Sequence, residues 1–103
     1  MHIISKKRFV EAADNHPNQR TAIMDIYRVL KAAKFKSPEE MRNVFPTLDN
    51  FKYKDRWKVI DIGGNHLRLI AYIQFSQNRM YVKYILTHAD YDKLSERGAK
   101  GEL

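Results

Sequence analysis

The chain has 103 residues, of which 44% are hydrophobic and 30% are charged, so we expect one domain with a modest core under a highly charged surface. Lysine and arginine total 19 against 12 aspartate and glutamate residues, and the formal charge of +7 favours a partner rich in phosphate or an acidic protein partner. The sequence has no cysteine, which excludes disulfide and thiolate chemistry. It also has no apolar run approaching the ~20 residues that span a bilayer and no secretory signal, which predicts a cytoplasmic protein without a membrane partner.

The first part of the chain predicts a short strand and two helices. Residues 2–5 suit a strand, and apolar residues at helical spacing predict helices over 5–15 and 18–34. The pair His16-Pro17 separates the helices, because the residue before a proline avoids the α region. The side chains expected to face the core are Phe9, Ala12, Ala13, Ile23, Ile26, Tyr27, Leu30 and Ala33.

A third, short helix is predicted by the sequence SPEE. Ser37 suits the N-cap, Pro38 the first helical position, and Glu40 follows three residues after the cap. This helix should end before the segment FPTLDN at 45–50.

Three strand-like runs follow, at 56–62, 67–75 and 80–86. Turn signals at 63–65 (GGN) and 76–78 (SQN) predict tight connections and therefore an antiparallel meander. On the second run, one face carries Leu67, Leu69, Ala71, Ile73 and Phe75. On the third run, simple alternation places Met80, Val82, Tyr84 and Leu86 opposite Tyr81, Lys83 and Ile85.

The last element is a predicted short helix over 87–97, with Thr87 as N-cap, and the last six residues should form a loose tail. The expected fold class is therefore α+β, a single domain over 1–103 with N-terminal helices packed on a small antiparallel sheet and a short C-terminal helix. The opposite sheet face should be partly open to solvent and carry Arg68, Tyr72, Lys83 and Lys58.

Cations and aromatics alternate in the stretch FKYKDRWK, residues 51–58. The cations are Lys52, Lys54, Arg56 and Lys58, and the aromatics are Phe51, Tyr53 and Trp57. If the stretch is a strand, its cations would lie on one side, where they could bind an RNA backbone. Two plainer interpretations stand beside this one: the cations protect an exposed sheet edge from aggregation, or part of the stretch is a loop. Trp57 is expected to pack in the core.

Two proton-transfer groups lie at the start of the last predicted helix. With Thr87 as cap, His88 and Tyr91 are three residues apart and share one face near the helix N-terminus, where a phosphate can bind. Histidine can act as acid or base near neutral pH, whereas tyrosine needs nearby cations to act as a base. Arg68 and Lys83 would supply these cations if the sheet brings them close.

Such a set suits the cleavage of RNA by its own 2′-hydroxyl without a metal ion or other cofactor. Plainer roles are open for each residue: Arg68 could pair with Asp61 across the hairpin, His88 could bond a carbonyl, and Tyr91 could pack at the rim of the core. His88 and Asp92 are four residues apart, but a single pair at helical spacing is a weak sign of a metal site. We therefore assign no metal ligands.

Two segments, GGNHLRLIAYI (63–73) and RMYVKYILTHADYDKL (79–94), resemble the HigB family of bacterial toxins, a branch of the RelE-like ribosome-dependent mRNA interferases. The shared pattern is G-N-H-L-R-L, a second strand with Y-V-K, and then T-H-A-D-Y-D-K. The segment PTLDNFKY (46–53) and the N-terminal helices are also similar, so the resemblance spans nearly the whole chain. The G-N-x-x-R motif alone is weak, and the specificity lies in the ordered combination within a basic chain.

The resemblance implies a RelE-like fold and a toxin that cleaves mRNA in the ribosomal A site and so inhibits translation. It also implies neutralisation by a cognate HigA-type helix-turn-helix antitoxin, with operator DNA bound only through that antitoxin. Carried over by position, the catalytic residues would be Arg68, Lys83, His88 and Tyr91, and the cations of FKYKDRWK would grip ribosomal RNA and mRNA. The chain departs from the pattern at Lys83, where many relatives have arginine, and at Asp61, where asparagine is common.

Two other functions compete with a ribosome-dependent endoribonuclease. A non-catalytic module could bind the ribosome or nucleic acid and act by occupancy, and it would lose little when His88 and Tyr91 are replaced. A protein-interaction domain could use its basic surface only for an acidic partner, and it would not bind ribosomes at moderate salt. Codon preference, the binding face of the antitoxin and the assignment of acid and base do not follow from the sequence.

Overall fold

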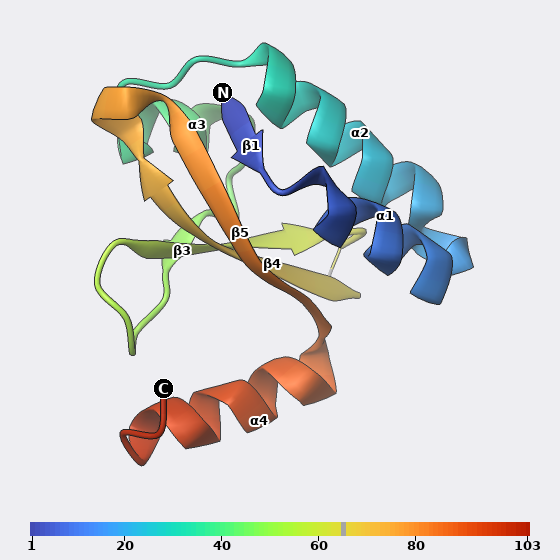
Figure 1. The fold of residues 1–103 in the computed structure, drawn as a ribbon, viewed down its shortest axis with the longest axis vertical. Coiled ribbons are helices and arrows are strands. Elements are labelled where there is room, and N and C mark those ends of the chain that lie inside the picture. The colour runs from blue at the N-terminus through green and yellow to red at the C-terminus, as the bar shows by residue number, and fades with distance from the viewer. Residues whose placement is uncertain (65) are drawn as a thin grey trace.

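The protein folds into a mixed β-sheet between two layers of helices (Figure 1). This is seen in a computed structural model, which describes residues 1–64 and 66–103. The sheet order is β1-β5-β4-β3-β2. α1, α2 and α3 pack on one face and α4 lies on the other. The elements are β1 (His2–Ile4), α1 (Lys6–Asn15), α2 (Arg20–Ala32), α3 (Pro38–Val44), β2 (Asp49–Asn50), β3 (Trp57–Ile62), β4 (Leu67–Gln74), β5 (Arg79–Thr87) and α4 (His88–Ala99), with 3₁₀ turns at Pro17–Gln19 and Phe75–Gln77.

The α+β fold class is confirmed, with one addition to the expected sheet. β3, β4 and β5 form the predicted antiparallel meander, but β1 joins the edge of β5 in parallel. The connection from β1 to the rest of the sheet includes α1, α2 and α3, and a parallel pair requires a crossover of this kind. In the described part of the chain, no helix is both long and apolar enough to cross a membrane.

The main core lies between the sheet and the N-terminal helices. Six of the eight helix residues predicted to face the core are buried, and the other two, Ile26 and Ala33, are half-buried against it. The second helix begins at Arg20 instead of residue 18, because Pro17–Gln19 form a 3₁₀ turn. The start of α3 is as predicted: the Ser37 hydroxyl accepts a hydrogen bond from the Glu40 N–H at 3.2 Å.

The turn after β3 also follows the prediction in its first two residues. Gly63 and Gly64 have φ angles of 60° and 72°, a region that glycine enters without steric cost. Asn65, the last residue of the predicted turn, lies outside the described residues.

A β-bulge in β5 overturns the predicted alternation of the third run. Ile70 of β4 pairs with Tyr84, but the next residue, Ala71, pairs with Val82, so Lys83 is an extra residue. Side chains beyond the bulge therefore change faces. Met80 and Val82 point to the main core as predicted, whereas Tyr84 and Leu86 pack on the α4 side and Ile85 on the opposite side.

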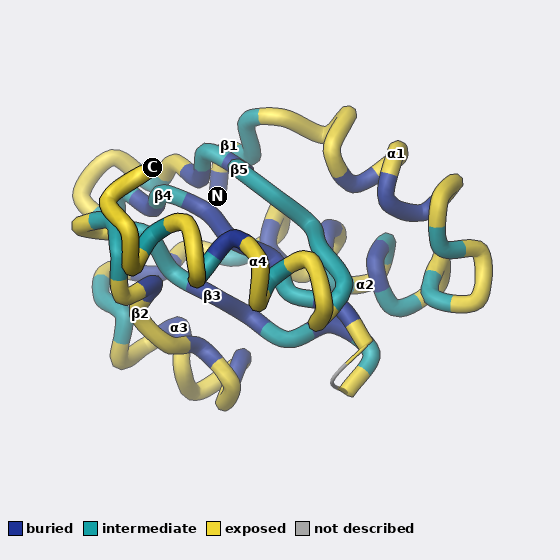
Figure 2. Tube along the Cα trace, turned by 90° about the horizontal axis from the view of Figure 1, so that it is seen from below, coloured by how far each residue is buried: buried dark blue, intermediate teal, exposed yellow. Residues whose placement is uncertain are grey.

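A second hydrophobic cluster fixes α4 against the sheet. Thr87 caps the helix as predicted, with its hydroxyl accepting from the Asp90 N–H at 3.2 Å. Figure 2 shows α4 exposed along most of its length, with one buried segment, which contains Leu94. Leu94 packs with Phe51, Val59 and Ile70, so this sheet face is partly covered by α4. The helix extends to Ala99, two residues beyond the predicted end.

Replacing Leu94 with alanine is expected to lower the free energy of unfolding by about 2–5 kcal/mol, because the side chain is only 4% exposed and leaves a cavity beneath α4. Urea unfolding monitored by circular dichroism would measure this loss. Glu96→Ala, an exposed position on the same helix, is the matched control and should change stability by less than about 0.5 kcal/mol. Equal small effects of both substitutions would contradict the packing of α4 on the sheet.

Candidate active site

Arg68, His88 and Tyr91 meet on the α4 side of the sheet. Arg68 is the second residue of β4, and β5 ends at Thr87, so His88 opens α4 beside that strand. The Arg68 Nη2 atom lies 3.2 Å from His88 Nδ1, and its Cζ lies 5.7 Å from the centre of the Tyr91 ring. The structure therefore brings together three of the four predicted catalytic residues.

Asp61 holds the Arg68 side chain from the neighbouring strand. The two residues are cross-strand partners, and Arg68 Nη1 donates to Asp61 Oδ1 at 2.7 Å. Their side chains are only 15% and 22% exposed, far less than those of the other ion pairs in the described residues. The plainer role considered for Arg68, pairing with Asp61, is thus real. It does not exclude anion binding, because a guanidinium has five N–H donors.

The contact with Arg68 indicates which nitrogen of His88 carries the proton. A guanidinium can only donate, so His88 Nδ1 must accept, and the proton of the neutral imidazole lies on Nε2. His88 Nε2 faces Asp92 Oδ2 at 3.6 Å, which is too long for a hydrogen bond, and the His88 side chain is 61% exposed. His88 therefore presents a donor N–H toward solvent and any bound substrate. Within residues 1–64 and 66–103, no three acidic or histidine side chains gather to hold a metal ion.

Lys83, the fourth predicted catalytic residue, lies on the same face but apart from this cluster. Its Nζ sits 5.6 Å from the centre of the Trp57 ring. Lys83 comes three positions before Leu86, the residue of β5 that pairs with Arg68. At the usual rise of a strand this is a separation of roughly 10 Å along β5. Tyr84, which alternation had placed on the opposite face, lies with its ring centre 6.5 Å from that of Trp57.

The stretch FKYKDRWK is mostly a loop, so its predicted alternation holds only where β3 begins. The Phe51 N–H donates to the Trp57 carbonyl at 2.8 Å, which closes the loop, and Arg56 has a φ of 64°. The aromatic rings contact one another nonetheless. The ring centre of Phe51 lies 5.8 Å from that of Trp57, in a stacked arrangement, and 5.7 Å from that of Tyr53, in an edge-on arrangement. Trp57 is half-buried and belongs to the second cluster instead of the main core.

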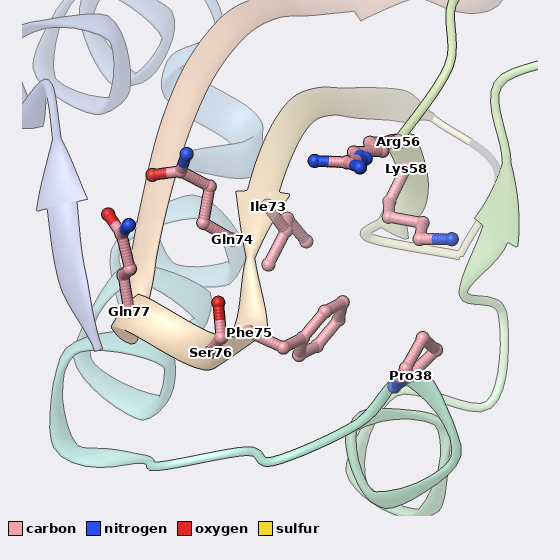
Figure 3. A pocket seen from close by; sticks show the side chains of 8 residues that line it. All are labelled: Pro38, Arg56, Lys58, Ile73, Gln74, Phe75, Ser76 and Gln77. Carbon is pink, nitrogen blue, oxygen red and sulfur yellow. The ribbon is translucent and has the colours of Figure 1, made fainter.

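The four predicted RNA-binding cations all border one hollow on the surface, which is lined by residues 50–58. Lys52 extends over the Tyr53 ring, 5.7 Å from its centre, and Lys54 lies in the same loop. Arg56 and Lys58 also border a second pocket, whose lining includes Ile73, Phe75 and Pro38, as Figure 3 shows. The prediction that Lys58 shares a face with Arg68 is wrong. Lys58 pairs with Ala71, whose side chain lies in the main core, and successive strand residues point to opposite faces.

The comparisons with known proteins agree with one another. A family model described as HigB_toxin, the RelE-like toxic component of a toxin-antitoxin system, matches residues 19–94. A protein named mRNA interferase HigB from Escherichia coli O6:H1 is 56% identical over 95 residues, which cover 92% of each chain. The mRNA interferase toxin HigB of Escherichia coli strain K12 and the mRNA interferase HigB of Shigella flexneri are each 38% identical over 92 residues, covering 89% of this chain and 88% of theirs.

These matches include the whole cluster of Arg68, His88 and Tyr91 and extend over most of the fold. A toxic component of a toxin-antitoxin system implies a cognate antitoxin as partner. The chain belongs to the HigB family of RelE-like toxins.

Proposed function

We propose that this toxin is an endoribonuclease that cleaves mRNA in the ribosomal A site and thereby inhibits translation until its antitoxin binds. The observation that supports this most directly is the contact between a guanidinium, an imidazole and a phenol ring at the start of α4. The names of its relatives, which describe mRNA interferases, support the same substrate class. Such a protein works in the cytoplasm, as a single domain, with the ribosome and mRNA as partners.

The proposed reaction uses the 2′-hydroxyl of the RNA as nucleophile. A base removes the 2′ proton, the 2′ oxygen attacks the adjacent phosphorus, and an acid protonates the leaving 5′ oxygen, which leaves a 2′,3′-cyclic phosphate and a 5′-hydroxyl. We assign the acid to His88, which would donate from Nε2 as an imidazolium once its Nδ1 takes up a proton and leaves Arg68, and the base to Tyr91, which lies beside the Arg68 cation. No step requires a metal ion.

Arg68 and Lys83 have separate tasks in this scheme. Arg68 lies beside both proton-transfer groups, so its free N–H donors can stabilise the charge that builds on the phosphoryl oxygens. Lys83, roughly 10 Å further along β5, would contact a neighbouring phosphate of the same strand. Because Lys83 offers a point charge and no planar fork, it neutralises charge but does not orient the phosphate by two parallel bonds.

The remaining cations and the antitoxin complete the proposal. Lys52, Lys54, Arg56 and Lys58 would hold the backbone of ribosomal RNA and mRNA, a contact that is independent of sequence and weakened by salt. The antitoxin would be a HigA-type helix-turn-helix protein, and the toxin would reach operator DNA only through it.

Primer extension on a defined mRNA tests this function. We expect cuts when purified toxin meets programmed ribosomes, and intact mRNA when ribosomes are left out. A His88→Ala/Tyr91→Ala variant should bind ribosomes with the same salt dependence and leave the mRNA intact, because both proton-transfer groups are gone. Toxin dialysed against a chelator before the assay should cleave at the rate of untreated toxin.

Three results would contradict parts of this proposal. Intact mRNA in every lane, from a toxin that binds ribosomes and stops translation, would favour action by occupancy. Cuts of equal strength without ribosomes would exclude ribosome dependence, and loss of cleavage after dialysis would exclude a reaction without a metal ion.

A further inference from the structure

Tyr72 and Tyr81 form an aromatic pair with no role in either hydrophobic cluster. They are cross-strand partners on β4 and β5, with ring centres 5.8 Å apart and a tilt of 50°. Both are half-buried, yet neither packs into the two cores that the described residues form. A cross-strand aromatic pair can stabilise a sheet by itself, which is the plainer interpretation.

The position of the pair relative to the candidate active site argues for more than stability. Side chains at every second position of a strand share a face, so Arg68 and Tyr72 both point to the α4 side of β4, roughly 13 Å apart. α4 packs along Val59 and Ile70 and on Phe51. The two tyrosines lie outside that contact, on the part of the sheet face that the second cluster does not cover.

The β-bulge brings a cation to the same part of the face. Lys83 is the extra residue, and its Nζ lies over Trp57, whose cross-strand partner is Tyr72. Bulges often redirect a side chain beside an active site. The order along the face is therefore Arg68, then Lys83, then the two tyrosine rings, which combines cations with aromatic surface as proteins that bind single-stranded nucleic acid do.

The Tyr72 side chain is also held in place from the strand. Gln74 Nε2 lies 3.4 Å from the Tyr72 hydroxyl, at the long end of a hydrogen bond. The hydroxyl therefore has a partner within the protein, and the ring is the part of Tyr72 that remains for another molecule. A fixed ring loses little conformational freedom when a ligand stacks on it.

We propose that Tyr72 and Tyr81 form a platform on which an unpaired base of the substrate mRNA stacks, a short distance along the strand from the phosphate held by Arg68. This rests on the proposed function. The occupant is RNA because Arg68 and Lys83 sit along the same face, so a backbone held by both cations runs toward the rings. Every base has a π-face, so the platform favours no particular base.

The test removes the rings and the base separately and together. Cleavage is measured on programmed ribosomes with a set of mRNAs that carry one abasic nucleotide at each successive position around the cut. With wild-type toxin, an abasic nucleotide at one position should lower kcat/KM about tenfold, the scale expected for one lost stacking contact. Tyr72→Ala/Tyr81→Ala should show a similar loss on intact mRNA and no further loss at that position. Tyr72→Phe/Tyr81→Phe keeps the rings and should retain most of the activity that the alanine variant loses.

Each alternative result is distinct. If wild-type toxin fails to cut unmodified mRNA, the proposed function itself is wrong. If wild-type toxin cuts and the alanine variant cuts equally fast, or if its loss multiplies with that of every abasic position, the platform alone is wrong. If the alanine variant cuts normally but no longer binds the antitoxin, this face is an antitoxin contact instead. Circular dichroism and ribosome binding of the alanine variant show whether it is folded. If it is not, the phenylalanine variant, which keeps the rings, separates the loss of stacking from the folding defect.

Discussion

Replacing Arg68 with alanine is expected to lower the rate of mRNA cleavage about 100- to 1,000-fold, the usual effect of removing one positioned donor from a charge that develops in the transition state. Arg68 is the one cation in contact with both His88 and Tyr91 among the described residues. Single-turnover cleavage on programmed ribosomes would measure the rate, with ribosome affinity measured in parallel. That affinity should change little, because one phosphate contact among several is lost.

Two further variants separate the charge of Arg68 from its geometry and from its ion pair. Arg68→Lys keeps a positive charge but loses the planar fork, so most of the defect should remain. Asp61→Ala breaks the 2.7 Å ion pair while leaving the guanidinium, and it should cost much less cleavage than Arg68→Ala. Equal losses for Asp61→Ala and Arg68→Ala would contradict a role of the Arg68 charge that is independent of its ion pair.

The parts of the fold that the sequence predicts correctly depend on local signals. Ser37 and Thr87 cap α3 and α4 because a hydroxyl can accept the N–H three residues later, whatever the rest of the chain does. The burial of Phe9, Ile23 and Leu30 follows from helical spacing against a sheet. The same local logic places His88 and Tyr91 on one face of α4, one turn apart.

The parts that the sequence does not predict depend on pairing between strands. The bulge at Lys83 adds one residue to β5 and leaves no trace in the hydrophobic pattern, so it reverses the faces of Tyr84 and Ile85. Lys58 is misplaced for a related reason: the face of a strand residue is known only once its register is known. The loop at 51–56 looks like a strand because its aromatics alternate, yet they meet through ring contacts instead.

The candidate site shows both kinds of outcome. The T-H-A-D-Y segment is sufficient to place two proton-transfer groups together, and the pairing of β4 with β5, in which Leu67 lies opposite Thr87, brings Arg68 to them. The expected sheet face and the family position both assign Lys83 to the same cluster, but the bulge places it beside Trp57 instead. The tyrosine pair at Tyr72 and Tyr81 was not identified, because only the alignment of β4 with β5 brings the rings together.

The His88→Ala and Tyr91→Phe variants are each expected to lose about 100- to 10,000-fold in cleavage rate, the range for a lost general acid or base. A modified substrate should show which residue is the acid and which is the base. In an mRNA whose 5′-bridging oxygen at the cut is replaced by sulfur, the leaving thiolate departs without a proton. If His88 is the acid, His88→Ala should cut this mRNA at nearly the wild-type rate, because the leaving group no longer needs its proton. Tyr91→Phe should stay slow, because the 2′ proton must still be removed.

The reverse pattern, rescue of Tyr91→Phe alone, would exchange the two roles: Tyr91 would protonate the leaving oxygen and His88 would remove the 2′ proton. Lack of rescue for either variant would show that both residues position the RNA without transferring a proton at the leaving oxygen. Glu96→Ala, on the exposed side of α4, is the matched control and should cut both substrates as wild type does. The sulfur substrate thus tests which residue protonates the leaving oxygen, because only that proton transfer becomes unnecessary when sulfur replaces the oxygen.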